Sequence, residues 1–116
     1  MGIMNKILLI EDDQSINKIL AYELSKKGYQ VDSLFDGKEA VQTILKNDYD
    51  LVLVDWMLPY QNGVSIIKEV RSNDYVKPLI LLTARSEQED IIKGLEAGAD
   101  DYLTKPFQSA VLIARI

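Results

Sequence analysis

Leu51-Val52-Leu53-Val54 is a run of four branched apolar residues near the middle of the 116-residue chain. Two similar runs, at residues 7–10 and 79–82, contain only leucine and isoleucine. A strand that is apolar at every position is typical of a parallel sheet whose two faces are both covered by helices. The three runs therefore predict three central strands of an α/β fold.

The segments along the rest of the chain alternate regularly in character. Amphipathic stretches separate the apolar runs, and this rhythm predicts βα units. Residues 30–34 and 101–104 are mixed or half polar, as expected for edge strands. With right-handed crossovers, the simplest arrangement is a flavodoxin-like doubly wound, five-stranded parallel sheet of order 2-1-3-4-5, with helices on both faces.

Several residues mark the expected ends of helices. We expect Asp13 to be the N-cap of the first helix, and Gly28 and Gly98 to end the first and fourth helices. Two pairs resemble the capping boxes that start a helix: Asp36 with Glu39, and Ser86 with Glu89.

Apolar residues at helical spacing indicate which faces of two helices are buried. In the first helix these residues are Ile16, Ile19, Leu20 and Leu24. In the fourth helix they are Ile91, Ile92 and Leu95. We expect both stripes to pack in the core.

The composition of the chain limits its chemistry. A chain of 116 residues fits a single domain, and it contains no cysteine and no histidine. Thiol nucleophiles, imidazole bases and the common zinc ligands are therefore excluded. The net charge of -5 disfavours binding to nucleic acids or anionic membranes. The sequence has neither a run of about 20 apolar residues nor a readable signal peptide, so we expect a cytoplasmic protein with no membrane partner.

Acidic side chains follow two neighbouring strands of the predicted sheet. Glu11 and Asp12 come after the first strand, and Asp55 follows the third. Ligands of such sheets bind beyond the carboxyl ends of the strands, where the winding reverses between strands one and three. Three carboxylates in close contact repel one another unless a cation lies between them. With oxygen ligands only, the expected cofactor is Mg²⁺.

Two other strand ends at the same edge carry groups suited to a phosphoryl group. Thr83 supplies a hydroxyl donor after the fourth strand, and Lys105 supplies a positive charge after the fifth. An aspartate can form a covalent aspartyl phosphate. Phosphoryl transfer needs mainly positioning and charge neutralisation, so no general base is required.

These residues stand in motifs that resemble the signature set of response-regulator receiver domains. The motifs are Ile10-Glu11-Asp12, Asp55-Trp56-Met57-Leu58-Pro59, Thr83-Ala84 and Lys105-Pro106-Phe107. The resemblance runs from about Asn5 to the end of the chain.

The resemblance implies a role for each matching residue. Asp55 corresponds to the phosphoacceptor, which takes its phosphoryl group from a sensor histidine kinase. Thr83 and Lys105 correspond to the pair that contacts the phosphoryl group, and Tyr102 to the aromatic residue that follows Thr83 in the switch. The Mg²⁺ ligands would be Glu11, Asp12, Asp55 and the backbone carbonyl of Met57.

Gly98-Ala99-Asp100-Asp101-Tyr102 and Ala114-Arg115 further resemble the winged-helix, DNA-binding subfamily of response regulators. This resemblance implies that residues 1–116 are a receiver domain that ends before a C-terminal output domain, through which alone DNA would be contacted. It also implies a homodimer on phosphorylation, through a face formed by the fourth helix, fifth strand and fifth helix. The charged residues of this face would be Lys93, Asp100, Asp101 and Arg115. Val111 departs from the subfamily, which usually has Glu there.

Two alternatives remain open from the sequence. A freestanding receiver could act by protein contact or in a phosphorelay. The sequence that follows Ile116 would decide between a freestanding receiver and one with an attached output domain. A turnover phosphatase or phosphotransferase of related topology commonly has a second Asp two residues after its nucleophile. Met57 occupies that position here, so we expect a regulatory phosphoacceptor and not an enzyme.

Overall fold

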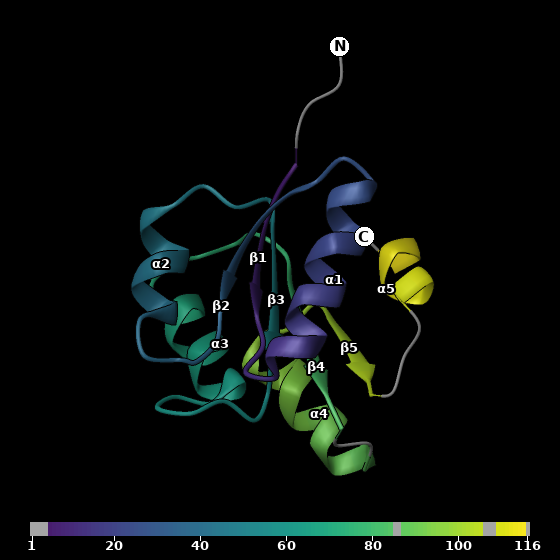
Figure 1. Ribbon diagram of the computed structural model, residues 1–116. Helices are drawn as coiled ribbons and strands as arrows, with labels where there is room; N and C mark the ends of the chain where they lie inside the picture. The colour runs from purple at the N-terminus through teal and green to yellow at the C-terminus, as the bar shows by residue number, and fades with distance from the viewer. Residues whose placement is uncertain (1–4, 85–86, 106–108, 116) are drawn as a thin grey trace.

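The computed structural model describes residues 5–84, 87–105 and 109–115. In this part of the chain five parallel strands form a single sheet of order β2-β1-β3-β4-β5, which confirms the predicted topology (Figure 1). The strands are β1 (Lys6–Ile10), β2 (Gln30–Leu34), β3 (Leu51–Asp55), β4 (Leu79–Thr83) and β5 (Asp101–Thr104). The two mixed segments are the edge strands, as expected.

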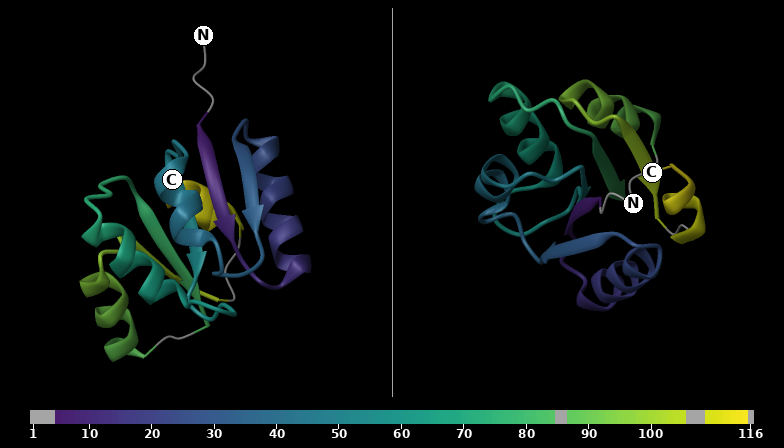
Figure 2. Two further views of the ribbon diagram at one scale, coloured as in Figure 1. Left: turned by 90° about the vertical axis from the view of Figure 1, so that its left-hand side faces the viewer. Right: turned by 90° about the horizontal axis from the view of Figure 1, so that it is seen from above.

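Five described helices cover the two faces of the sheet. Figures 1 and 2 show α1 and α5 on one face and α2, α3 and α4 on the other. The helices are α1 (Gln14–Lys26), α2 (Ala40–Lys46), α3 (Gly63–Ser72), α4 (Gln88–Ala97) and α5 (Ser109–Arg115). No helix in the described part of the chain is long and apolar enough to cross a membrane.

The core consists of two layers, because successive side chains of a strand point to opposite faces of the sheet. One layer, against α2, α3 and α4, contains Leu8, Ile10, Val52, Val54, Leu79 and Leu81. The other, against α1 and α5, contains Ile7, Leu9, Leu51, Leu53, Ile80 and Leu82. Burial on both faces explains why the three central strands are apolar at every position.

The helix ends agree only in part with the sequence predictions. Asp13 caps α1 by accepting a hydrogen bond from the Ile16 N–H at 3.1 Å, and Gly28 and Gly98 have the left-handed φ values of 98° and 124°. The capping box at Asp36 is wrong. Asp36 accepts from the Lys38 N–H at 2.9 Å in a turn, and α2 begins only at Ala40. Ser86 lies outside the described residues.

Both predicted apolar stripes contain residues that are exposed. Ile19 is 60% exposed, whereas Leu20 and Leu24 are buried as predicted. On α4, Ile92 and Leu95 are exposed, and the helix instead places Gly94 and Ala97 against the core. The rotation of α1 buries Asn17, whose side-chain amide donates to the carbonyl oxygens of Glu11 and Leu34. The inclusion of Ile19, Ile92 and Leu95 in the core stripes was therefore wrong.

Candidate functional site

The predicted acidic residues meet at the carboxyl end of the central strands. Each of Glu11, Asp12 and Asp55 offers one carboxylate oxygen, and these three oxygens lie within 4.8 Å of one another. The register of β1 and β3 brings them together, since Ile10 pairs with Val54, Glu11 and Asp12 follow Ile10, and Asp55 follows Val54. Glu11 and Asp55 are buried and Asp12 is exposed.

Backbone and side-chain hydrogen bonds fix the position of Glu11. Its backbone N–H donates to the carbonyl oxygen of Leu34 at 3.1 Å, and its own carbonyl accepts from the Asn17 amide at 3.0 Å. Its carboxylate Oε2 accepts from the backbone N–H of Asp13 at 3.0 Å. Asn17 was missed in the sequence, where it was not distinguished from the other residues of a surface helix.

Lys105 supplies the positive charge of the site. Its Nζ donates to the carboxylate of Glu11, and to Asp55 Oδ2 at 3.0 Å. Burial alone would lower the pKa of Lys105, but the hydrogen bonds to these two carboxylates outweigh it and raise the pKa above 10.5. Lys105 is therefore a permanent cation at neutral pH.

The site still holds more negative than positive charge. Three ionised carboxylates and one ammonium group leave a net charge of -2. Partial burial, a hydrogen bond with Glu11 and the negative charge of Glu11 together raise the pKa of Asp12 above 3.8. A divalent cation would neutralise this excess, and carboxylate oxygens are the ligands that Mg²⁺ prefers. The donor set therefore fits Mg²⁺.

The segment after β3 adds a backbone donor to the phosphoacceptor candidate. The Met57 N–H donates to Asp55 Oδ1 at 3.3 Å, whereas Lys105 contacts the other carboxylate oxygen, Oδ2. Thr83 follows Leu82, the residue paired with Asp55 in the sheet, and it is fully buried. The backbone carbonyl oxygen of Thr83 accepts a hydrogen bond from the backbone N–H of Lys105 at 2.6 Å. This bond joins the ends of β4 and β5.

Tyr102 lies in the core between the site and α4. Tyr102 is 9% exposed, and its ring meets the ring of Trp56 edge to face, with centroids 6.4 Å apart. A Cβ at Gly94 of α4 would lie 3.0 Å from two carbons of the Tyr102 ring. The backbone of α4 thus approaches the aromatic ring more closely than a residue with a side chain would allow.

The residues predicted for the dimer face have different surroundings. Lys93 is exposed, whereas Asp100 Oδ2 accepts from Arg71 Nη2 and from the Leu79 N–H, both at 2.8 Å. Arg71 was missed in the sequence, although it also donates to the carbonyl oxygens of Gly98, Tyr75 and Lys77. Asp101 Oδ1 accepts from the Tyr102 N–H at 2.8 Å. The side chain of Arg115 lies outside the described residues.

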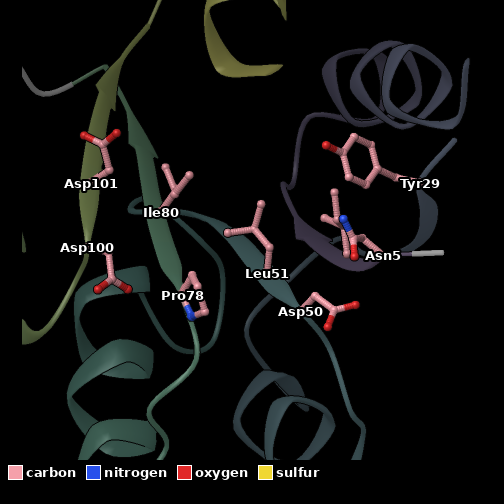
Figure 3. Close-up of a pocket in the computed structure, with 9 residues that line it drawn as sticks. Asn5, Tyr29, Asp50, Leu51, Pro78, Ile80, Asp100 and Asp101 are labelled. Carbon is pink, nitrogen blue, oxygen red and sulfur yellow. The ribbon is translucent and has the colours of Figure 1, made fainter. Parts of the chain in front are cut away.

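A pocket of about 360 Å³ lies at the amino ends of the strands, on the side of the sheet away from the acidic cluster (Figure 3). Its apolar lining includes Ile7, Leu51 and Ile80, which stand near the amino ends of β1, β3 and β4. Two of its acids are engaged elsewhere, since Asp50 accepts from the Lys6 N–H and Asp100 from Arg71. The pocket is remote from the acidic cluster and takes no part in that site.

A family model described as the response regulator receiver domain matches residues 7–116, and the chain belongs to this family. The transcriptional regulatory protein DltR of Streptococcus agalactiae serotype III (strain NEM316) is 47% identical over 111 residues, which are 96% of this chain and 50% of DltR. The response regulator ArlR of Staphylococcus saprophyticus is 44% identical over 113 residues, 97% of this chain and 51% of ArlR. The chain thus spans about half the length of these relatives.

Solved structures agree with this assignment. The Francisella response regulator 1452 receiver domain has a TM-score of 0.92 and 40% identity, with 96% of this chain and 92% of that chain covered. The chemotaxis protein CheY4 of Vibrio cholerae has a TM-score of 0.89 and 30% identity, with coverage of 97% and 96%. The predicted family and fold are confirmed, and the family is one of regulatory domains.

Proposed function

We propose that Asp55 accepts a phosphoryl group from a histidine of a sensor kinase, with Mg²⁺ held by Glu11, Asp12, Asp55 and the carbonyl of Met57. The observation that carries this proposal is the set of groups that surround the Asp55 carboxylate. One oxygen faces the Met57 N–H, the other faces the Lys105 ammonium, and two further acids lie within 4.8 Å. Such an arrangement suits a carboxylate that must attack a phosphoryl group and then carry it.

The chemistry requires little beyond charge and position. Asp55 attacks phosphorus as a carboxylate, the new O–P bond forms, and the P–N bond of the phosphohistidine breaks with its electron pair going to the imidazole. Lys105, Thr83 and the Met57 N–H offer donors to the phosphoryl oxygens. When bound, Mg²⁺ supplies charge neutralisation for those oxygens. Water attack on phosphorus would later release phosphate and restore Asp55.

We further propose that the phosphoryl state is read by the face formed by α4, β5 and α5. Tyr102 lies on β5 against Gly94 of α4, so a movement of Thr83 toward the phosphoryl group would allow the ring and the helix to shift. The face would then control a transcriptional output domain in the full-length cytoplasmic protein. DltR and ArlR, twice as long as the matched segment, support this reading.

A labelling experiment tests the phosphoacceptor. The wild type is incubated with acetyl phosphate and Mg²⁺ and its intact mass is measured. We expect one added phosphate on the wild type, one on the control Asp13→Asn, which changes a nearby helix cap outside the cluster, and none on Asp55→Asn. Chelation with EDTA should abolish labelling. Labelling of Asp55→Asn at wild-type yield would refute the role of Asp55.

One comparison favours a second candidate, the freestanding receiver. The match to CheY4 of Vibrio cholerae covers 96% of that chain, so a chain of this length also occurs in the family. The two candidates share the chemistry at Asp55. They differ in whether the receiver acts on an attached output domain or on a separate protein. The coding sequence after Ile116 distinguishes them, because a winged-helix domain there establishes the transcriptional form.

A further inference from the structure

Two loops leave the carboxyl ends of β2 and β3, on the side of the sheet that carries the acidic cluster, and a backbone contact joins them. Residues 35–39 connect β2 to α2, and residues 56–62 connect β3 to α3. The N–H of Gly37 in the first loop donates to the carbonyl oxygen of Pro59 in the second at 2.9 Å. The same oxygen accepts the N–H of Gln61 at 2.9 Å. Gly37 is therefore part of the hydrogen-bond pattern that shapes the second loop.

The contact leaves no room for a side chain at Gly37. A Cβ there would lie 2.0 Å from the carbonyl oxygen of Gln61 and 2.9 Å from its carbonyl carbon. Both are backbone atoms, so no rotamer change relieves the overlap. Gly37 is buried, and its φ lies outside the left-handed region, so the close approach and not the backbone conformation requires glycine.

A second pair of close contacts joins the two ends of the second loop to each other. The N–H of Gly63 donates to the carbonyl oxygen of Trp56 at 2.8 Å, and a Cβ at Gly63 would lie 2.3 Å from the carbonyl oxygen of Asp55. Tyr60, between Pro59 and Gln61, has a φ of 73°, a conformation that is uncommon for a bulky residue and that its surroundings must maintain. The loop is thus closed at its ends by the contact of Gly63 with Trp56 and held near its middle by Gly37.

We propose that Gly37 is a positioning residue that holds the peptide of Met57 over the acidic cluster. Met57 lies between Trp56 and Pro59, whose carbonyl oxygens accept from Gly63 and Gly37, and its N–H is 3.3 Å from Asp55 Oδ1. If the contact at Gly37 opens, the loop is released and the Met57 peptide is no longer held where its carbonyl would serve as a Mg²⁺ ligand. This inference rests on the proposed Mg²⁺ site and adds a residue from a different loop to it.

The test compares two glycine substitutions. Gly37→Ala inserts a methyl group into the contact, whereas the control Gly28→Ala meets no described heavy atom within 4 Å but is strained by its φ of 98°. Mg²⁺ is titrated while the fluorescence of Trp56 is recorded, since Trp56 is the only tryptophan and adjoins Asp55. We expect Gly37→Ala to weaken Mg²⁺ binding about five- to tenfold, a coupling typical of linked sites. Gly28→Ala should lose thermal stability and keep the wild-type Mg²⁺ affinity.

A measurement on the wild type remains decisive even if Gly37→Ala does not fold. Coupling is reciprocal, so Mg²⁺ must stabilise the contact that favours its binding. We expect saturating Mg²⁺ to slow hydrogen exchange of the Gly37 amide more than that of the Gly98 amide, which bonds to Leu95 at 3.1 Å far from the site. Equal effects on both amides, or an unchanged Mg²⁺ affinity in folded Gly37→Ala, would overturn the inference. A wild type that does not bind Mg²⁺ would instead refute the proposed function on which it rests.

Discussion

At the scale of single residues, the pKa of Asp12 is raised by burial and by the negative charge of Glu11. Its raised pKa means that the folded chain binds the Asp12 proton more tightly than the unfolded chain does. The metal-free protein therefore loses stability as the pH rises from 3.8 through the raised pKa, and the loss is complete at neutral pH. Asp12→Asn removes this cost. We expect a gain in unfolding free energy of less than ~1 kcal/mol at neutral pH, because Asp12 is exposed and solvent screens the repulsion.

Thermal melts with and without Mg²⁺ check this expectation. Mg²⁺ should raise the melting temperature of the wild type, since it binds the native state only, and should raise that of Asp12→Asn much less. Asp13→Asn is the matched control and should respond to Mg²⁺ as the wild type does. The effect of Mg²⁺ should fade as the pH falls toward the pKa of Asp12, because protons and the cation compete for the carboxylate. An unchanged wild-type midpoint in millimolar Mg²⁺ would speak against the site.

The proximity of the candidate site residues could be predicted because parallel strands bring their carboxyl ends to one edge of the sheet. Glu11, Asp55 and Thr83 directly follow or end apolar runs, so the strand prediction alone placed them together. Gly37 and Arg71 could not be found in this way, because their contacts join loops and helix ends whose geometry no local pattern specifies. Gly37 packs against the backbone of Gln61, and Arg71 bonds the carbonyl oxygen of Gly98, so each depends on a backbone segment far away in the sequence.

At the scale of secondary-structure elements, the rotation of a helix about its axis depends on tertiary contacts. The apolar pattern of α1 suggested that Ile19 is buried, yet the helix turns Asn17 inward to join the end of β1 to the end of β2. Close packing of Gly94 against Leu81 and Tyr102 similarly sets the rotation of α4 and leaves Ile92 and Leu95 exposed. The sequence therefore predicted that these helices are amphipathic, but it did not predict which of two neighbouring faces is buried.

The inward position of Asn17 predicts a loss of stability when its amide is removed. Asn17 is buried and its amide bonds two carbonyl oxygens, at 3.0 and 3.2 Å, so Asn17→Ala leaves buried acceptors without that donor. We expect the free energy of unfolding to fall by about 1–3 kcal/mol. Asn47→Ala, which removes an exposed amide bond to Thr43, should change it by about 0.5 kcal/mol or less. Equal losses for the two variants in urea unfolding would contradict the proposed role of Asn17.

At the scale of the whole molecule, phosphorylation should drive weak two-fold dimerisation through the face of α4, β5 and α5. An isologous interface contains every ion pair twice, but each exposed pair contributes only ~0.2–1 kcal/mol. Asp100 already pairs with Arg71 in its own chain, so Lys93, Asp101 and Arg115 carry more of the expected cross-pairing. Exposed Ile92, Leu95 and Val111 add apolar area on the same helices. The dimer should therefore be weak and sensitive to salt.

Sedimentation velocity with and without beryllium fluoride, a phosphoryl mimic, measures this dimer. Activation should shift the wild type toward dimer, Arg115→Ala should abolish the shift, and Val111→Glu should strengthen it by supplying an acid for Lys93. A longer chain that continues past Ile116 serves as the reference. If that longer chain stays monomeric when activated at high concentration, the dimer is refuted and the freestanding receiver is favoured.

In the proposed function, the phosphoryl group resides on Asp55. Borohydride reduces an acyl phosphate to an alcohol, so treatment of the phosphorylated protein converts the modified aspartate to homoserine. Tandem mass spectrometry of the peptides then locates that residue. We predict homoserine at position 55 only, dependent on both Mg²⁺ and the phosphoryl donor. Homoserine at position 12 or 13 in place of 55, or a phosphate that borohydride leaves unchanged, would contradict the account.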